Sequence, residues 1–184
     1  MDGVTIQRAE KSDLRSILEL QYLAYQSEAR LLDDFTIPPL LQTLEGVEAE
    51  FAGGVFLKAV CGGRKTPPEN AAIIGSVRGY CDGNTAFIGK LIVAPDMQGR
   101  GIGTALLAAV EAELAHAARY DNKSNLKSDF DYYELFTSAK SERTLRLYER
   151  LGYVRCREQR ISDKLTLIFL EKKRKFTIGG IDEK

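Results

Sequence analysis

The chain has 184 residues, 44% of them hydrophobic, which suits one domain with its own core. Basic residues (Lys and Arg) and acidic residues (Asp and Glu) both number 26, so the formal net charge is zero. This balance argues against binding to nucleic acid or to an anionic membrane surface.

The number and spacing of the three cysteines indicate the redox state of the cellular compartment and whether a metal site is present. Cys61, Cys81 and Cys156 form an odd set without metal-ligand spacing, which argues against a disulfide framework and against a zinc site. We therefore expect three free thiols, no bound metal and a reducing, cytoplasmic location. The N-terminal residues lack the pattern of a signal peptide, and charged residues interrupt the most apolar helix too early for a membrane span.

The N-terminal part of the chain predicts one strand and two helices. Alternating residues over 4–9 predict the strand, and a helix begins near Ser12, which can cap it. Pro38 and Pro39 interrupt the chain before a second helix, which we expect from Leu40 to Phe51.

The middle of the chain predicts three strands, over 55–61, 71–81 and 85–94. A turn-rich loop at 62–70 separates the first two strands. The turn "DGN" at 82–84 predicts a hairpin between the second and the third.

The C-terminal part predicts two helices and three strands. A long alanine-rich helix ends near Arg119 and is followed by a polar loop at 120–129. A strand, a short helix that stops at a glycine, and two closing strands follow, over 132–139, 141–153, 153–161 and 164–172. We expect one domain over residues 1–184, with 171–184 as a tail.

This order of elements mixes antiparallel hairpins with helical crossovers. A purely parallel, doubly wound sheet does not fit that order. The sequence predicts an α/β (α+β) fold with a mixed, mostly antiparallel central sheet of about seven strands and helices on both faces.

The stretch "DMQGRGIGTALL", residues 96–107, places three glycines at alternate positions before the long helix. Glycines let backbone N–H groups approach a ligand, and the first turn of a helix has free N–H groups and a positive dipole end. Such a loop suits phosphate or pyrophosphate, although turn flexibility alone also explains glycines. A P-loop would need a lysine that is absent here, and Thr104 and Leu106 stand where a dinucleotide fingerprint needs Gly or Ala.

Two motifs resemble those of the GNAT superfamily of N-acetyltransferases. The glycine loop resembles the family's acetyl-coenzyme A loop, with Gln98, Gly101 and Gly103 at the motif positions. The stretch "SERTLRLYERLGYV", residues 141–154, resembles a later helix of the family, and the matching residues are Leu147, Tyr148, Leu151, Gly152 and Tyr153. The resemblance covers residues 4–171 and implies a sheet that splays open at a cleft for acetyl-coenzyme A, which serves as cosubstrate.

The resemblance also implies roles in the cofactor site. Backbone groups of Leu91, Ile92 and Val93 would hold the pantetheine arm and the thioester, with the Val93 N–H as an oxyanion donor. The pyrophosphate would lie on the loop residues Gln98, Gly99, Arg100, Gly101, Ile102, Gly103 and Thr104. The family often has an Asn that contacts coenzyme A where Ser141 stands, and Ser141 alternatively only caps its helix.

By the same resemblance, Tyr148 would be the acid that protonates the leaving thiolate, since a tyrosine with a pKa of about 10 keeps its proton at neutral pH. Its apolar helical neighbours also fit a core aromatic residue. Some members of the family carry a glutamate base on the strand before the loop, where Gly89 stands here. Glu134 and Glu28 are then the candidates for activating a water, and either fits a structural role equally well.

These observations predict an acetyl-coenzyme A-dependent N-acetyltransferase in which the amine attacks the thioester directly in a ternary complex. A non-catalytic acyl-coenzyme A sensor is an alternative, because the strand carboxylate is missing, and a nucleotide-binding regulator rests on the glycine loop alone.

The acceptor would be a primary amine of a small molecule or a peptide. By resemblance, residues 23–39 should line the acceptor side of the cleft, where Glu28, Asp33 and Asp34 favour a cationic amine. No nucleic acid, membrane or metal partner is expected, and a homodimer is left open.

Overall fold

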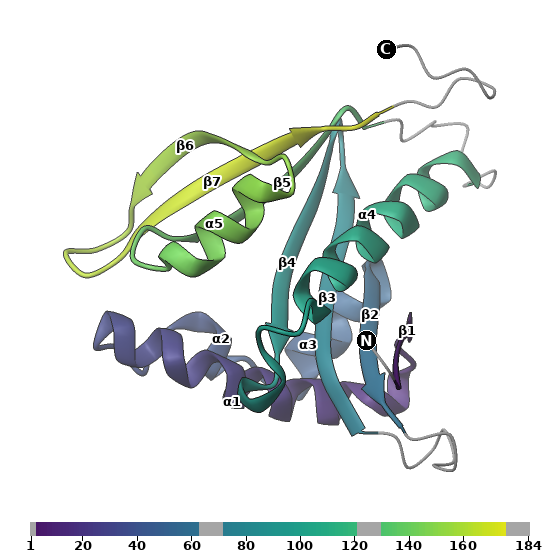
Figure 1. Ribbon diagram of the computed structural model, residues 1–184, viewed down its shortest axis with the longest axis horizontal. Coiled ribbons are helices and arrows are strands. Elements are labelled where there is room, and N and C mark those ends of the chain that lie inside the picture. The colour runs from purple at the N-terminus through teal and green to yellow at the C-terminus, as the bar shows by residue number, and fades with distance from the viewer. Residues whose placement is uncertain (1–2, 63–71, 121–129, 176–184) are drawn as a thin grey trace.

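Seven strands form one sheet in the part of the chain that the computed structural model describes, residues 3–62, 72–120 and 130–175 (Figure 1). The strands are β1 (Val4–Arg8), β2 (Val55–Cys61), β3 (Ala72–Asp82), β4 (Thr85–Val93), β5 (Tyr132–Ser138), β6 (Val154–Arg160) and β7 (Thr166–Lys173). Their order across the sheet is β1-β2-β3-β4-β5-β7-β6, and all neighbouring pairs are antiparallel except β4 and β5. The mixed, mostly antiparallel sheet predicted from the sequence is confirmed.

Helices cover both faces of this sheet (Figure 1). They are α1 (Leu14–Leu32), α2 (Pro38–Leu41), α3 (Leu44–Gly53), α4 (Ile102–Tyr120) and α5 (Glu142–Arg150). Two consecutive residues of β2 show which helices cover which face. Phe56 packs with residues of α1 and α3, whereas Leu57 belongs to the main core with residues of α4. Because successive strand residues point to opposite faces, α1 and α3 cover one face and α4 covers the other.

Helix α4 lies unusually close to β3, and two glycines make this possible. A Cβ atom at Gly75 would lie 2.9 Å from Cδ1 of Leu106, and one at Gly79 would lie 2.7 Å from Cδ1 of Leu114. A side chain at either position would force the leucine to move and would press on backbone oxygens 3.1 Å away, so glycine favours this close packing. The close contact fixes the N-terminal end of α4, and with it the glycine loop, against the sheet.

The segment predicted as one helix over 40–51 forms two helices instead. Gln42 has extended backbone angles, with ψ at 133°, and ends α2 after four residues. Thr43 then begins α3, because its hydroxyl accepts a hydrogen bond from the Gly46 N–H at 3.2 Å. The break matters for the cleft, since it places the Gln42 side chain next to β3.

Other expectations concern the loops and the ends of the chain. The loops predicted at 62–70 and 120–129 fall, apart from their first residues, outside the described residues. Strand β7 continues to Lys173 and Arg174 is buried, so the first residues of the predicted tail belong to the fold, while 176–184 are not described. In the described part of the chain, no helix is long and apolar enough to cross a membrane. The three cysteines are free thiols, as predicted.

Candidate active site

Strands β4 and β5 separate soon after they meet. Their parallel pairing comprises three residue pairs, of which the last joins Phe87 to Glu134. Beyond this pair β4 continues for six residues to Val93, and the two strands diverge (Figure 1). A cleft of about 980 Å³ lies at this opening, lined by residues of α1, α3, β3, β4, β5 and α5. The splayed sheet expected from the resemblance is therefore present.

A β-bulge shapes the β4 wall of the cleft. The pairing of β3 with β4 shifts register between Ser76 and Arg78, and Lys90 has a φ of 51°, in the left-handed region that non-glycine residues seldom adopt. After the bulge the Ala94 N–H donates to the carbonyl of Ile74 on β3, at 2.8 Å. Because backbone groups alternate along a strand, the Val93 N–H points away from β3, toward the opening.

The glycine loop lies at one end of this opening. Gly99 and Gly101 have φ values of 78° and 81°, so both positions need glycine for backbone reasons. A Cβ atom at Gly101 would meet no other atom within 4 Å, which leaves free space above the loop. Gly103 is different: it lies in the first turn of α4, and a Cβ there would make ordinary contacts with Leu147 and Val93.

Polar side chains tie the loop to the strand and to α5. The Gln98 side chain donates to the Val93 carbonyl at 3.2 Å, and Arg143 donates to the Gln98 side-chain oxygen at 3.3 Å. Arg143 also reaches over Gly99, since its Nη2 would lie 3.6 Å from a Cβ there. Arg100 donates to the Asp96 carbonyl. Sequence reasoning missed Arg143, which the fold brings from the first turn of α5 to the anion-binding end.

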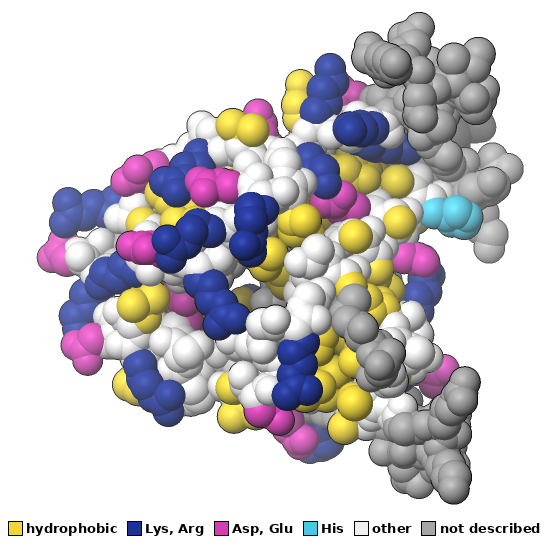
Figure 2. Space-filling view, in the orientation of Figure 1, with side chains coloured by type: hydrophobic (Ala, Val, Ile, Leu, Met, Phe, Trp, Pro, Cys, Tyr) yellow, Lys and Arg dark blue, Asp and Glu magenta, His cyan; other side chains and the backbone are white. Residues whose placement is uncertain are grey.

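Basic side chains are frequent on this side of the cleft. Figure 2 shows lysine and arginine side chains gathered over α5 and the β6–β7 pair. Arg143 is the one whose contact with the loop is direct. The positive end of the α4 dipole, the free N–H groups of its first turn and this guanidinium all favour an anion at the loop.

Tyr148 of α5 lines the cleft across from β4. It is 6% exposed, and its ring packs 6.0 Å from the ring of Tyr153. Burial, together with the nearby Tyr25 and Glu28, raises the pKa of the Tyr148 hydroxyl well above its usual value. The hydroxyl therefore holds its proton at every pH at which proteins normally work. Its ring belongs to the core, and the residue also lines the cleft, so the role as acid stays a prediction.

Glu28 of α1 also lines the cleft, and Ser141 holds it in place. The Ser141 hydroxyl lies 2.7 Å from both carboxylate oxygens of Glu28 and donates its proton to them. It makes no side-chain hydrogen bond that would cap α5. The structure thus brings together two residues, 113 positions apart, that the sequence singled out for different reasons.

Tyr25 is a residue of the cleft that sequence reasoning missed. Burial first, and then the charge of Glu28, raise the pKa of its hydroxyl to about 12, while Arg78 acts in the opposite direction. The signal was present in the sequence, because Tyr25 and Glu28 are three residues apart and such residues share one face of a helix.

The other acidic candidates lie elsewhere. Glu134 is ion-paired with Arg157 of β6 at 3.7 Å and does not line the described cleft. Asp33 is paired with Lys164 at 2.8 Å, which lowers the pKa of its carboxyl, and Asp34 accepts hydrogen bonds from Thr36. Among the residues that the structure describes, no group of three His, Cys, Asp or Glu side chains is placed to hold a metal ion.

Comparisons with known proteins agree with this geometry. Residues 68–155 match the family model of the GNAT acetyltransferase domain. Many solved structures share the fold. The three described next are at most 19% identical to this chain, so their likeness concerns the fold alone. The comparison with curated proteins gave no match.

Three of the similar structures bear on the cofactor and on the acceptor. The ribosomal-protein-S18-alanine N-acetyltransferase from Escherichia coli has a TM-score of 0.68 at 16% identity, over 98% of this chain and 99% of that one. The protein yncA from Salmonella typhimurium, solved with its cofactor acetyl-CoA, has a TM-score of 0.66 at 19% identity, over 94% of each chain. The PaiA N-acetyltransferase from Thermoplasma acidophilum, in complex with coenzyme A, has a TM-score of 0.67 at 14% identity, over 93% and 99%.

Proposed function

Since the chain carries an acetyltransferase domain of the GNAT family, we propose that it transfers an acetyl group from acetyl-coenzyme A to a primary amine. The amine attacks the thioester directly, while both substrates are bound. The acceptor is a small molecule or a peptide. The S18-alanine N-acetyltransferase of similar fold supports a peptide or amino-acid amine as one such acceptor.

The observation that carries this proposal is the opening between β4 and β5. The unpaired edge of β4, the buried Tyr148 and the carboxylate of Glu28 all line one cleft, and Gln98, the residue before Gly99 of the glycine loop, lines it as well. Acyl transfer needs an anion-binding loop for the cofactor, a donor for the developing oxyanion and an acid near the leaving sulfur.

The residues present fit coenzyme A. Open space above Gly101, the first turn of α4 and the Arg143 guanidinium suit a pyrophosphate. The β4 edge after Phe87 lacks a strand partner in the described sheet, so its outward backbone groups are available to the amide-rich pantetheine arm. When bound, the cofactor supplies the activated acetyl group.

The chain's own residues then act on the reacting atoms. The Val93 N–H donates to the thioester oxygen as negative charge develops there, because its direction is fixed by the strand. With the cofactor bound, the amine would add to the thioester carbon first, and the Tyr148 hydroxyl would give its proton to the sulfur as the carbon–sulfur bond then breaks. Glu28, directly or through a water, takes the proton that the amine loses, and a proton returns to Tyr148 through the solvent.

A screen of thiol release over diverse amines tests this function. Purified protein is mixed with acetyl-coenzyme A and one amine at a time, and the free thiol of coenzyme A is measured with a chromogenic disulfide. We expect amine-dependent release for at least one class of acceptor, with the acetylated amine identified by mass spectrometry. Tight binding of acetyl-coenzyme A without release for any amine would favour the acyl-coenzyme A sensor, which the missing carboxylate at Gly89 suggests.

A further inference from the structure

The acceptor side of the cleft is less acidic than the sequence suggested. Of the acidic residues expected there, Asp33 and Asp34 do not line it. The charged residues that do line the described cleft are Glu28, Glu50, Arg78 and Lys90. Two of these four side chains, Arg78 and Lys90, are cations that come from the sheet. A site that binds only a cationic amine would not be expected to contain them.

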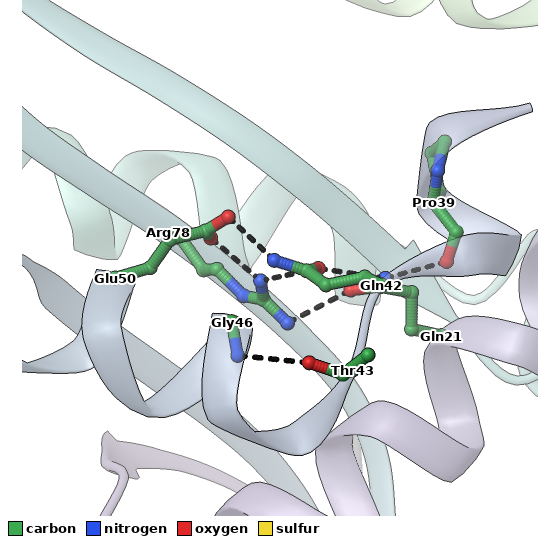
Figure 3. Close-up of polar contacts among 7 residues, drawn as sticks. All are labelled: Gln21, Pro39, Gln42, Thr43, Gly46, Glu50 and Arg78. Carbon is green, nitrogen blue, oxygen red and sulfur yellow. Dashed lines mark hydrogen bonds and ion pairs between the residues drawn. The ribbon is translucent and has the colours of Figure 1, made fainter.

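Arg78 of β3 lines the cleft, and several polar side chains contact its guanidinium (Figure 3). Its guanidinium donates to Glu50 at 2.7 Å, to Gln42 at 3.1 Å and to Gln21 at 2.8 Å. The group is 5% exposed and lies 4.8 Å from the ring centre of Phe56. Part of its role is structural, because these bonds tie α1 and α3 to β3.

The bonds of Arg78 leave donor capacity and charge unmatched. Its Nε is buried and has no hydrogen-bond partner among the described residues. The single carboxylate that pairs with it, Glu50, has a side chain that is 46% exposed, so water screens much of that pair. The Nε is too buried to meet a ligand, so an anion in the cleft would be stabilised by the charge of the guanidinium rather than by a bond to Nε.

Lys90 is the second cation, and it comes from the bulge of β4. The residue is half-buried and lines the cleft, yet within the described residues its ammonium makes no hydrogen bond or ion pair. Burial lowers the pKa of Lys90, and the charge of Arg78 adds to this effect, whereas Glu50 opposes it. The positive φ at this position shows that the bulge keeps Lys90 in a backbone conformation that lysine does not favour.

Gly89 leaves room for a ligand beside both cations. It pairs directly with Arg78 across the two strands, and Lys90 follows it in the chain. A Cβ at Gly89 would meet no atom within 4 Å, so the space in front of this strand pair is open. The position that carries a base in some relatives by resemblance is thus an opening flanked by two positive charges.

The opposite charge reaches the same cavity from a helix. Glu28 lines it from α1, together with Tyr25, and Tyr148 lines it from α5. Arg78 and Lys90 line it from β3 and β4, and Glu50 is paired with Arg78. The cavity therefore receives a negative charge from α1 and two positive charges from the sheet, one of them partly offset by Glu50.

We propose that the acceptor carries a carboxylate as well as its amine, with the carboxylate bound between Lys90 and Arg78 and the amine directed toward Glu28 and Tyr148. The acceptor class is a free amino acid or a compound of the same zwitterionic pattern. Its side chain is apolar, because Ile37, Phe136 and Leu165 line the walls of the cleft. This inference rests on the proposed function and adds the chemical class of the acceptor to it.

The test compares amino acids with their carboxamides, which lack the negative charge and have a less basic α-amine, so each rate is expressed per concentration of unprotonated amine. Acetyl transfer to L-leucine and L-phenylalanine, and to the amides of both, is measured as kcat/KM. We expect a preference of about tenfold or more for the free acid in the wild-type protein, because the amide leaves the two cations unpaired. In the Lys90→Met variant this ratio should fall toward one. Lys164→Met is the matched control, since Lys164 is an exposed lysine paired with Asp33, and it should keep the wild-type ratio.

A second variant supplies the carboxylate from the protein itself. Gly89→Glu has space for its side chain and would place an anion beside Lys90 and Arg78. It should abolish the preference for the free acid, as Lys90→Met does, without removing either cation. Circular dichroism of each variant shows whether the fold is retained.

Equilibrium binding separates this inference from the proposed function. The same four acceptors are titrated by calorimetry into protein saturated with coenzyme A, so no turnover is needed. Binding of the acids that is tighter by about tenfold or more supports the carboxylate subsite, whether or not any acceptor is acetylated. If no acceptor in any panel is acetylated, the proposed function is wrong but the subsite is still supported. Equal binding of acids and amides, no binding of either, or an unchanged ratio in Lys90→Met overturns the subsite and leaves the acetyltransferase function standing.

Discussion

The cofactor half and the acceptor half of the cleft are built from different parts of the chain. The cofactor half consists mainly of backbone: the glycine loop, the first turn of α4 and the free edge of β4. The acceptor half consists of side chains that reach the cavity from α1, α3, β3 and β4. A backbone site depends on local conformation, whereas a side-chain site depends on which residue the sheet register brings to each position.

This difference suggests which half fixes the reaction and which half selects the acceptor. Backbone N–H groups offer the same donors in any chain that adopts the loop, so they suit a cofactor that many proteins share. Side chains such as Lys90 and Arg78 can change without altering the fold of the loop. Tyr148 and Glu28 lie where the two halves meet, and the strongest tests address them first.

Tyr148→Phe should have the largest effect on catalysis. The variant keeps the ring in the core and removes only the hydroxyl, so the melting temperature should change little. General acid catalysis contributes about a hundredfold or more, and kcat should fall by about that factor. The dissociation constant of acetyl-coenzyme A should hardly change, because the proton is needed in the transition state.

A second tyrosine provides the control for this loss. The Tyr133 hydroxyl donates to the Glu111 carbonyl on the α4 side of the sheet, and the residue does not line the described cleft. Tyr133→Phe should therefore retain the wild-type kcat. A Tyr148→Phe enzyme with full kcat would return Tyr148 to a role in packing alone.

Glu28→Gln should come next, and Glu134→Gln gives its comparison. Glu28 lies in the cleft beside Tyr148, whereas Glu134 pairs with Arg157 away from it. If Glu28 accepts the proton of the amine, its loss should lower kcat by about tenfold or more and alter the rise of rate with pH. Full pH profiles of both variants decide the matter: two unaltered profiles would mean that the amine loses its proton to solvent before it binds.

Gly101→Ala should weaken the cofactor half selectively. A Cβ at a φ of 81° strains the backbone and occupies the space that a pyrophosphate needs. We expect coenzyme A to bind about tenfold more weakly, which is a loss of about 1.4 kcal/mol. The acceptor preference for acid over amide should persist.

Gly83→Ala is the matched control for backbone strain. Gly83 lies in the hairpin turn between β3 and β4, has a φ of 55° and has open space around its Cβ position. Both variants should lose a similar stability, on the order of 1 kcal/mol. Equal weakening of coenzyme A binding in both would show that the loss at Gly101 reflects general destabilisation.

The smallest expected effect is the absence of an alkaline decline in rate. Burial disfavours a phenolate, so it raises the pKa of Tyr148 above its usual value, and the pKa of Tyr25 is raised to about 12. Both hydroxyls thus keep their protons as the pH rises, while the acceptor amine loses its own. The rate of acetyl transfer should rise with pH and reach a plateau, and a decline below a pH of about 10 would show a phenol that ionises normally.

The sequence predicted the cofactor half better than the acceptor half, for physical reasons. Gly99, Gly101 and the helix after them are a local pattern, and a local pattern survives in the fold. Tyr148 was found through its motif. Lys90 was not found, because the alternation of a strand gives no sign of the bulge that changes its direction.

Pairings across the chain were equally hidden. Ser141 was expected to contact coenzyme A or to cap its helix, and its bond to Glu28 depends on the way α1 crosses the sheet. The break at Gln42 and the cap at Thr43 divided a helix that periodicity alone joined. The contacts of Arg78 depend on the course of α1 and on the break between α2 and α3. Its guanidinium bonds to residues of α1, of α3 and of the link between α2 and α3.

Amide hydrogen exchange tests most directly whether the cofactor half is a backbone site for acetyl-coenzyme A. Exchange is measured for the free protein and with saturating acetyl-coenzyme A, and NAD serves as the control nucleotide. We predict that acetyl-coenzyme A slows exchange over residues 91–93 and 99–104, whereas NAD does not. Unchanged exchange in both segments, or equal protection by NAD, would contradict this assignment.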